Sequence, residues 1–539
     1  MKENNLVKNA SVLMIATVIS RVIGLIYRRP LGQVLGNVGL GYYGYASNLY
    51  AILLLVSSYS IPMAVSKIVS ERLALKQYKN AQKVFRGALM YAAIVGGIAA
   101  LVAFFGGSIL LPSNQQNAVP ALRVLAPTIF LAAVLGVFRG YFQAHHSMTP
   151  TSISQILEQI MNAIVSVAAA YLLIRHLAPE GGTKAAIYGA VGGTTGTAAG
   201  VLTGLLVMLF IYMLNRPYFR KEKRKDTHKG EETYGQVFGI IFMMITPIIF
   251  TTFVNNAGAY LDSYIYSAML DRHMSADAIS AAYGEYSNYY MPIINIPLAL
   301  ASASASAMMP EVSGEYALHD LNAVNGNVNK TIRLTMFLCI PSMVGMTVLA
   351  YPIMGVLFPS STDLAGKLLL TGAVYVVFAA LSTITGSVLQ SIGKQRVTLI
   401  NAAIALLLNI VILAVMLILA PKLSIYAVML ANIFYALIYC IVNDIMLRKY
   451  LGYRNEWIKT YLQPLIASAI MGAAAYGIYE GLFMLTRRPF IALLAAVVAA
   501  VLLYLIVYVK ISGTTKEEMR RFPMGTKLVR ILQIIHIYH

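Results

Sequence analysis

The sequence predicts an all-α integral membrane protein with about 14 transmembrane helices, arranged as two pseudo-symmetric six-helix lobes followed by two further helices. Three observations predict this class. Of 539 residues, 58% are hydrophobic and only 12% are charged, a composition that does not suit a water-soluble surface. Apolar runs long enough to cross roughly 30 Å of hydrocarbon recur along the whole chain. The first half of the sequence also recurs in the second.

The predicted spans are the apolar runs between polar clusters. The first run is basic and then apolar, like a signal peptide, but it continues past Arg21 without a small-residue cleavage site, so we take it as a span. The fourteen predicted spans are 9–34, 42–69, 84–111, 120–143, 150–175, 186–214, 236–268, 283–310, 331–358, 366–391, 395–419, 424–447, 460–484 and 489–511.

Basic residues predict the orientation of these spans. With the N-terminus inside, the cytoplasmic segments hold about 29 of the 41 Lys and Arg residues, and the external loops about 8. The positive-inside rule then places both termini in the cytoplasm. The formal charge of +20 lies in short clusters between apolar runs, without the interleaved aromatic residues that stack on bases. We therefore expect anionic membrane lipids, and no nucleic acid, as partners.

An internal repeat predicts the domain plan. YGYASNLY at 43–50 resembles YGEYSNYY at 283–290, an offset of 240, and Thr151 with Thr398 and Asn162 with Asn409 share an offset of 247. Six spans separate the copies, and because six is even, both copies enter the membrane in the same direction. This predicts parallel lobes that face each other across a cavity.

The domain boundaries follow from the repeat. The last two spans fall outside the duplication and could line a groove for a lipid-like ligand. The C-terminal segment, which ends in KLVRILQIIHIYH, reads either as an interfacial amphipathic helix or as a solvated basic end. The predicted parts are a first lobe at 1–215, a basic cytoplasmic linker at 216–235, a second lobe at 236–447, two additional spans at 448–512 and a cytoplasmic amphipathic tail at 513–539.

Arginines in the first span are the leading candidates for binding. Arg21 lies near the predicted midplane, where a charge costs at least about 2.5 kcal/mol unless it meets water or a partner. Arg28 is seven residues further on, close to the same helix face, with Arg29 beside it. Guanidinium groups bind phosphate oxygens in pairs, so this ladder predicts an anionic, phosphate-bearing ligand. The alternative for Arg28 and Arg29 is that they extend to the membrane interface.

Two deep carboxylates are candidates for coupling to an ion. Asp262 has Asn255 and Asn256 nearby in the sequence, and Glu158 lies in the fifth span. Either could bind Na⁺ or carry H⁺, or balance an arginine; for Glu158 we favour a structural role, with an arginine or between the lobes. No cofactor is expected. His145 and His146 point to different faces of a helix, so we expect no metal site there.

Two further observations concern a pair of asparagines and the lack of enzyme motifs in the sequence. Asn48 and Asn288 occupy matching places in the repeat, which favours hydrogen bonding between helices over substrate contact. The sequence holds no phosphate-binding P-loop, nucleophile elbow or zinc-protease motif. With external loops of about ten residues, this disfavours an ATP-driven pump and a membrane enzyme, and favours a secondary transporter.

Three segments resemble a known family. SRVIGLIYRRP at 20–30, IPMAVSKIVSE at 61–71 and VFRGYFQAHHSMTPTSISQILEQIMNAI at 137–164 are similar to the polysaccharide-exporter branch of the MOP superfamily, notably its YtgP and SpoVB-like members and its MurJ-type lipid II flippases. The resemblance implies the MurJ/MATE-like fold, alternating access and an undecaprenyl-diphosphate-linked sugar as substrate. It also implies a bacterial cytoplasmic membrane location, with cell-wall synthesis proteins as further candidate partners.

The resemblance also implies site residues. Arg21 matches a family arginine that handles the diphosphate, whereas the second family arginine matches Arg28 only after a one-residue shift, which leaves Arg28 and Arg29 open. The family's arginine in the eighth span has no counterpart in YSNYYMPIINIP. Asn288, Asn295 and tyrosines would then bind the headgroup, or the glycan would differ.

The resulting functional prediction is a flippase for an undecaprenyl-diphosphate-linked sugar, first of all the peptidoglycan precursor lipid II. Alternatives are an ion-coupled multidrug exporter of the same superfamily, and a flippase for a capsule, teichoic or sporulation glycan unit. A membrane glycan-transfer enzyme and a scaffold for wall synthesis are the alternatives from other classes.

Overall fold

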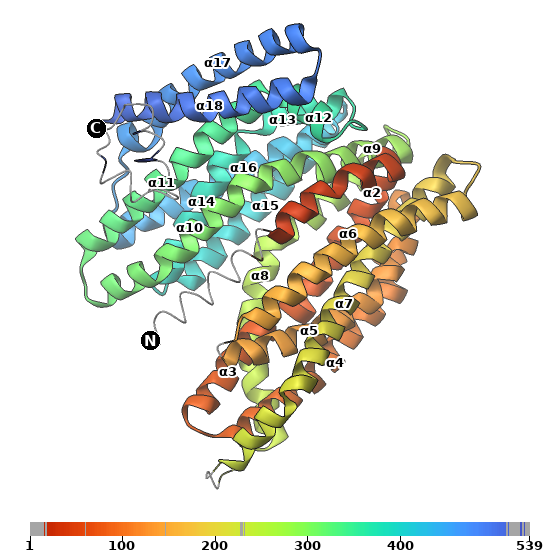
Figure 1. Cartoon of the computed structure of the whole chain (residues 1–539), viewed down its shortest axis with the longest axis vertical. Helices are drawn as coiled ribbons and strands as arrows, with labels where there is room; N and C mark the ends of the chain where they lie inside the picture. The colour runs from red at the N-terminus through yellow and green to blue at the C-terminus, as the bar shows by residue number, and fades with distance from the viewer. Residues whose placement is uncertain are drawn as a thin grey trace. The chain divides into compact units, whose positions relative to one another are not determined.

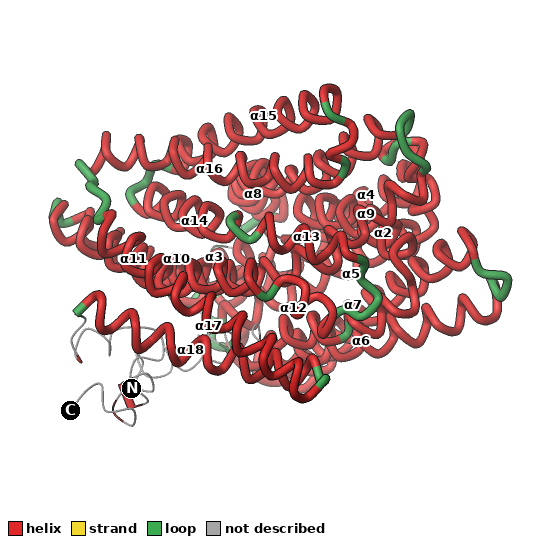
Figure 2. The backbone as a smooth tube through the Cα atoms, turned by 90° about the horizontal axis from the view of Figure 1, so that it is seen from above, coloured by secondary structure: helices red, strands yellow, loops and turns green. Residues whose placement is uncertain are grey.

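The structure is a computed structural model that describes residues 16, 19–59, 61–145, 147–226, 230, 232–513, 516, 529, 530 and 533. These residues form helices and loops, and no strand occurs among them (Figure 2). The predicted amphipathic tail at 513–539 and the start of the first predicted span lie largely outside the described residues.

The helices follow one another as Figure 1 shows. Short π-helical segments at Leu55–Tyr59, Tyr286–Tyr290 and Ile458–Leu462 interrupt three of the helical runs. The α-helices are α2 (Arg28–Leu54), α3 (Ile61–Ala74), α4 (Tyr78–Leu110), α5 (Val119–Ala144), α6 (Thr149–Leu177), α7 (Gly182–Arg224), α8 (Tyr234–Leu270), α9 (Ala276–Glu285), α10 (Met291–Ala317), α11 (Leu321–Val348), α12 (Ala350–Leu357), α13 (Asp363–Gly372), α14 (Tyr375–Ser391), α15 (Gln395–Leu419), α16 (Ile425–Leu451), α17 (Gln463–Thr486) and α18 (Pro489–Ser512).

The chain is a multi-pass membrane protein, but the predicted count of fourteen spans is not confirmed. Eleven helices in the described part of the chain are long and apolar enough to cross a membrane, or twelve if the bent pair α13 and α14 is one span. One cause is the link between the first two predicted spans. Where a loop was predicted at 35–41, α2 continues, with a kink at Gly36, whose φ of 64° suits glycine.

Corresponding helices in the two halves of the chain end at positions separated by the same offset as the sequence repeat. α4 ends at Leu110 and α12 at Leu357, while α5 ends at Ala144 and α14 at Ser391, so both pairs are 247 residues apart. The copies differ within this frame. α5 is one continuous helix, whereas its counterpart is broken between α13 and α14 and bent by 50°.

The chain forms two compact units, residues 1–284 and 285–539. This division falls later than the predicted linker at 216–235, so α8 and most of α9 belong to the first unit; the division into lobes stays a prediction. The first part of that linker is helical, because α7 continues to Arg224.

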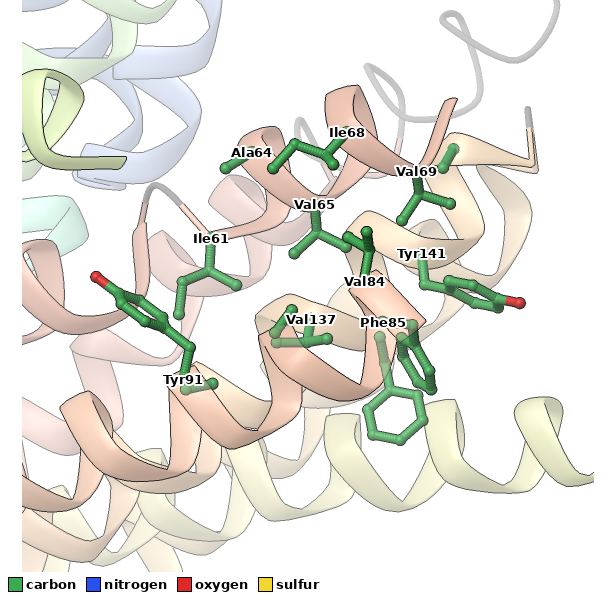
Figure 3. Close-up of a cluster of buried hydrophobic side chains, with 14 of the residues drawn as sticks. Ile61, Ala64, Val65, Ile68, Val69, Val84, Phe85, Tyr91, Val137 and Tyr141 are labelled. Carbon is green, nitrogen blue, oxygen red and sulfur yellow. The ribbon is translucent and has the colours of Figure 1, made fainter. Parts of the chain in front are cut away.

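Each unit has its own apolar core. In unit 1, side chains from α3, α4, α5, α7 and α8 pack together, and Figure 3 shows Val65, Val84 and Val137 pointing toward one another. In unit 2, residues of α11, α17 and α18 form one core. Within it, the Phe337 ring of α11 contacts Tyr504 and Tyr508 of α18, and the Tyr504 hydroxyl donates to the Phe337 carbonyl at 2.8 Å. The two helices outside the repeat are therefore part of unit 2.

Candidate functional site

The closest helix contact near the predicted external end of unit 1 joins α2 and α9. A Cβ added at Gly41 would overlap the carbonyl oxygen of Ser280, and one added at Gly284 would overlap the carbonyl oxygen of Asn37. The two backbones therefore touch, which only glycine permits at these positions. This contact holds α9 and the end of α8 against the first helices of the chain.

Buried and half-buried polar side chains line this contact. Asn48 of α2 donates to the Tyr283 hydroxyl of α9, and the Tyr283 ring stacks on Tyr45 with the ring centroids 4.6 Å apart. Asp262 of α8 is only 2% exposed and lies near enough to Tyr283 for the two groups to interact electrostatically. A carboxylate so far from water needs polar partners, and the Tyr283 hydroxyl group is one polar group near it.

The loop between α4 and α5 covers the cluster. Gln115 donates to the Ser263 carbonyl at 3.0 Å, and Asn114 donates to the Ser267 carbonyl at 2.8 Å. Asn117 donates to the Tyr42 hydroxyl at 3.0 Å, and that hydroxyl donates to an Asp277 carboxylate oxygen at 2.9 Å. Four segments, α2, the loop, α8 and α9, are thus joined by hydrogen bonds.

The other predicted ion-coupling residues lie away from Asp262. The Asn256 side chain is exposed and donates to the Thr252 carbonyl of its own helix at 2.8 Å. The side chain of Asn255 lies outside the described ones. Among the described residues, no group of three or more His, Cys, Asp or Glu side chains is placed to hold a metal ion, so an ion at Asp262 would depend on neutral oxygens.

Glu158 is part of a separate ion pair. Its Oε2 accepts from Nη2 of Arg139 at 2.7 Å, while Nε of Arg139 donates to the Ser154 hydroxyl at 3.1 Å. Both charged side chains are largely buried, at 16% and 21% exposed. The structure therefore places Glu158 in an arginine pair, which is the structural role that the sequence favoured.

The arginines of the first helix are placed differently. Arg21 and Arg29 are exposed, and no salt bridge in the described part of the chain includes either. Arg28 is half-buried and has a partner. Hydrogen bonds from Tyr27 to Ile23 and from Leu31 to Tyr27 continue the helix between Arg21 and Arg28, as the predicted ladder requires.

Two of the three predicted substrate asparagines belong to unit 2. Asn288 is buried in the π-helical segment and donates to the Ser287 hydroxyl at 2.9 Å. Asn295 is exposed on α10. Asn48 is in unit 1, so the structure does not gather the three asparagines in one unit.

The structural roles of several polar residues were not predicted from the sequence. Tyr283 and Gln115 stand in polar segments, YGEYSNYY and PSNQQNA, whose pattern signals neither burial nor a partner. Glu285 is 2% exposed and accepts from the Thr362 hydroxyl at 2.6 Å and from backbone N–H groups of Thr362 and Ala365, at 3.2 and 3.1 Å. This carboxylate satisfies the first turn of α13, a role that only the fold reveals.

Comparison with known proteins adds family information. Residues 6–314 match the family model described as polysaccharide biosynthesis protein, and residues 247–415 match the MatE model. Lipid II flippase MurJ of Bacillus subtilis is 24% identical over 493 residues, covering 87% of this chain and 88% of that protein. Stage V sporulation protein B of the same organism is 21% identical over 535 residues, covering 98% and 100%.

Solved structures share the fold. A multidrug resistance MATE family transporter of the MOP superfamily, in an inward-facing conformation, matches with a TM-score of 0.65 at 13% identity, over 83% of this chain and 98% of that one. Lipid II flippase MurJ in an inward closed conformation matches with a TM-score of 0.64 at 18% identity, over 92% and 98%. The MurJ/MATE-like fold predicted from the sequence is confirmed.

Proposed function

Because the chain belongs to the polysaccharide biosynthesis protein family, we propose that it is a flippase that moves an undecaprenyl-diphosphate-linked sugar from the inner to the outer leaflet. It is a secondary transporter and not an enzyme. Lipid II is the first candidate substrate, since a relative that aligns over most of the chain is named as a lipid II flippase.

This proposal rests on the difference between an arginine that has a counter-charge and two arginines of the first helix that have none in the described part of the chain. Arg139 is neutralised by Glu158 at 2.7 Å, whereas Arg21 and Arg29 are exposed and take part in no salt bridge of the described chain. At the predicted depth of Arg21, an unpaired charge requires water or an anion. A diphosphate headgroup supplies oxygens that guanidinium groups bind strongly.

Alternating access is the proposed mechanism. In this mechanism, the α2–α9 contact and the hydrogen bonds of Tyr42, Asn48 and Gln115 would keep the predicted external end of unit 1 closed during loading. Loading would then occur from the cytoplasmic side, and release would require this contact to open while the prenyl tail stays in lipid.

Coupling to an ion is proposed at Asp262. Na⁺ binding or protonation at this buried carboxylate would change the charge beside Tyr283 and Asn48, and so bias the contact between α2 and α9. Glu158, already paired with Arg139, is less suited to this role. Because Asp262→Asn keeps the shape and removes the charge, transport by that variant should no longer respond to a Na⁺ or H⁺ gradient.

An ion-coupled multidrug exporter is the second candidate. It is favoured by the fold shared with a MATE transporter and by the buried carboxylate of Asp262. This alternative expects acids to dominate the binding cavity and organic cations to be the ligands, whereas the first-helix arginines favour an anion.

The identity of the glycan is also a proposal. A relative named for stage V of sporulation aligns over 98% of this chain, so a sporulation, capsule or teichoic unit remains an alternative to lipid II. The proposed location is the bacterial cytoplasmic membrane with both termini inside, next to anionic lipids and cell-wall synthesis proteins.

Two experiments test the function. In detergent, undecaprenyl diphosphate should raise the unfolding temperature of the purified protein, whereas organic cations should not; the reverse result would favour the exporter. Depletion of the protein in its native cells should then cause one undecaprenyl-linked intermediate to accumulate on the cytoplasmic side, which identifies the glycan. No accumulation of any such intermediate would contradict the flippase.

A further inference from the structure

The last turns of α7 form an ordered helical extension beyond the apolar part of the helix. α7 has 43 residues, about 64 Å at 1.5 Å per residue, whereas a bilayer with its headgroups is roughly 40–45 Å thick. The apolar sequence ends near Leu214, and the helix continues through Pro217 to Arg224. The extension, Asn215–Arg224, therefore reaches into or beyond the headgroup layer on the predicted cytoplasmic side.

Aromatic packing holds this extension in place. Phe219 is 4% exposed, and its ring centroid lies 5.1 Å from that of Tyr141 and 5.0 Å from that of His145. Glu222, one turn later, lies 3.4 Å from Nε2 of His145 and accepts from the Tyr218 hydroxyl at 2.8 Å. One face of the extension is thus packed against the end of α5.

Beside this packed face lies a basic face, which we define as Arg216, Arg220, Lys223 and Arg224. All four are exposed, and none is in a salt bridge within the described part of the chain. The nearby acids are used elsewhere: Glu222 faces His145, Asp226 accepts from the Lys79 N–H at 2.5 Å, and Glu232 pairs with Arg72 at 2.7 Å. The exposed surface of the extension, to which Lys221 and Lys225 also contribute, is therefore strongly positive.

The basic face continues the lipid-facing stripe of the same helix. Leu202, Leu206 and Met213 are exposed at 44%, 56% and 61%, as expected for side chains in contact with acyl chains. Eighteen residues make five turns of an α-helix, so Arg220 lies on the same face as Leu202, and Arg224 on the same face as Leu206. The cations thus begin where the acyl-chain contact ends.

From this alignment we infer that the basic face is a binding site for anionic phospholipid headgroups of the inner leaflet. Guanidinium and ammonium groups bind lipid phosphates. The helix dipole accounts for cations in the last turn, but not for Arg220 and Arg216, which lie about one and two turns earlier. An acidic protein or a nucleic acid would not need a site aligned with the acyl-chain stripe. The inference does not depend on which substrate the protein moves.

The test measures how added lipid stabilises the purified full chain in mixed micelles. Phosphatidylglycerol should raise the unfolding temperature more than phosphatidylcholine does. A Lys or Arg near an anionic membrane contributes about 1 kcal/mol, or about fivefold in affinity, so R216Q/R220Q should raise the half-maximal phosphatidylglycerol concentration by about 25-fold. The variant F219A, which frees the extension from its packing, should weaken the same response.

A matched control removes two cations from the other end of the α6–α7 hairpin. Arg175 and Lys184 are also exposed, so R175Q/K184Q tests the loss of two positive charges alone and should keep the wild-type response. An equal loss in this control, or an unchanged response in R216Q/R220Q, would overturn the inference. Equal stabilisation by inorganic phosphate or by heparin would also overturn it, in favour of a free anion or an acidic macromolecule.

Discussion

Corresponding helices of the two repeats are connected by different chemistry. In unit 1, Arg139 of α5 binds Ser154 and Glu158 of α6. The offset of 247 places Gly386, Asn401 and Ala405 at these positions in unit 2. There the Asn401 amide donates to Asn443 of α16 at 2.9 Å, and the Asn443 amide donates to Thr385 at 3.3 Å. A charged bridge in one copy is replaced by a neutral one in the other.

The contact between α6 and α7 also differs from the corresponding contact between α15 and α16. In unit 1, α6 and α7 touch through their backbones, because a Cβ at Gly196 would overlap Ser166 and one at Gly200 would lie 2.6 Å from the Glu158 carbonyl oxygen. In unit 2, amide side chains connect α15 and α16. The same sequence repeat thus contains two kinds of helix contact. In unit 1 the helix backbones touch and a charge pair lies nearby, whereas in unit 2 uncharged side chains connect the helices.

The largest expected effect is the loss of the charge pair. Glu158→Ala leaves Arg139 largely buried without its counter-charge, which should lower the free energy of unfolding by about 3 kcal/mol. Unfolding by denaturing detergent measures this difference. If the two residues act as a pair, R139Q/E158Q should be less destabilised than Glu158→Ala. The pairing would be contradicted if the double variant lost as much free energy of unfolding as the Arg139 and Glu158 single variants lose together.

The close contact in unit 1 gives the next largest effect. Gly196→Ala places a methyl group into the Ser166 backbone and should cost about 2 kcal/mol, because α6 and α7 must move apart. Gly386→Ala in unit 2 is the matched control: the nearest atom to its Cβ would be the Tyr439 hydroxyl oxygen at 3.2 Å, the end of a side chain that can shift. Equal destabilisation by both substitutions would remove the proposed difference between the units.

The smallest of the three effects concerns the amide bridge. Asn443→Ala removes its hydrogen bonds with Asn401 and Thr385 and should cost about 1 kcal/mol, in line with hydrogen bonds between membrane helices. Asn215→Ala serves as the control, since the Asn215 amide donates at 2.8 Å only within its own helix, to Ile211. The bridge would be unimportant if the two variants unfolded at the same detergent concentration.

Composition and periodicity were sufficient to predict the class, the repeat and most helices. Apolar runs fix which segments lie in lipid, and identities such as Thr151 with Thr398 fix the offset that the ends of α5 and α14 share. The predicted gap at 35–41 contains glycines at 36, 39 and 41, and the chain does kink there, at Gly36, although it is helical on both sides. Two of them, Gly39 and Gly41, instead sit in close helix contacts.

The site was predicted only in part. Glu158 could be assigned to an arginine because buried charges need partners, and Asp262 stood out as a charge inside an apolar run. Their neighbours could not be predicted: Tyr283 and Gln115 reach Asn48 and Ser263 across 235 and 148 residues, and such contacts leave no periodic signal. Asn256 was grouped with Asp262 by sequence distance, although a spacing of six residues places the two side chains roughly 120° apart around the helix.

Transport by reconstituted protein tests the central claim most directly. Vesicles that contain the full chain and a fluorescent undecaprenyl-diphosphate sugar should expose the sugar on the opposite leaflet. Arg21→Ala should slow this step at least about tenfold, as expected for a lost charged hydrogen bond to phosphate. Arg175→Ala, an exposed arginine at the end of α6, should leave the rate unchanged. Full transport by folded Arg21→Ala protein would contradict the proposed role of the first-helix arginines.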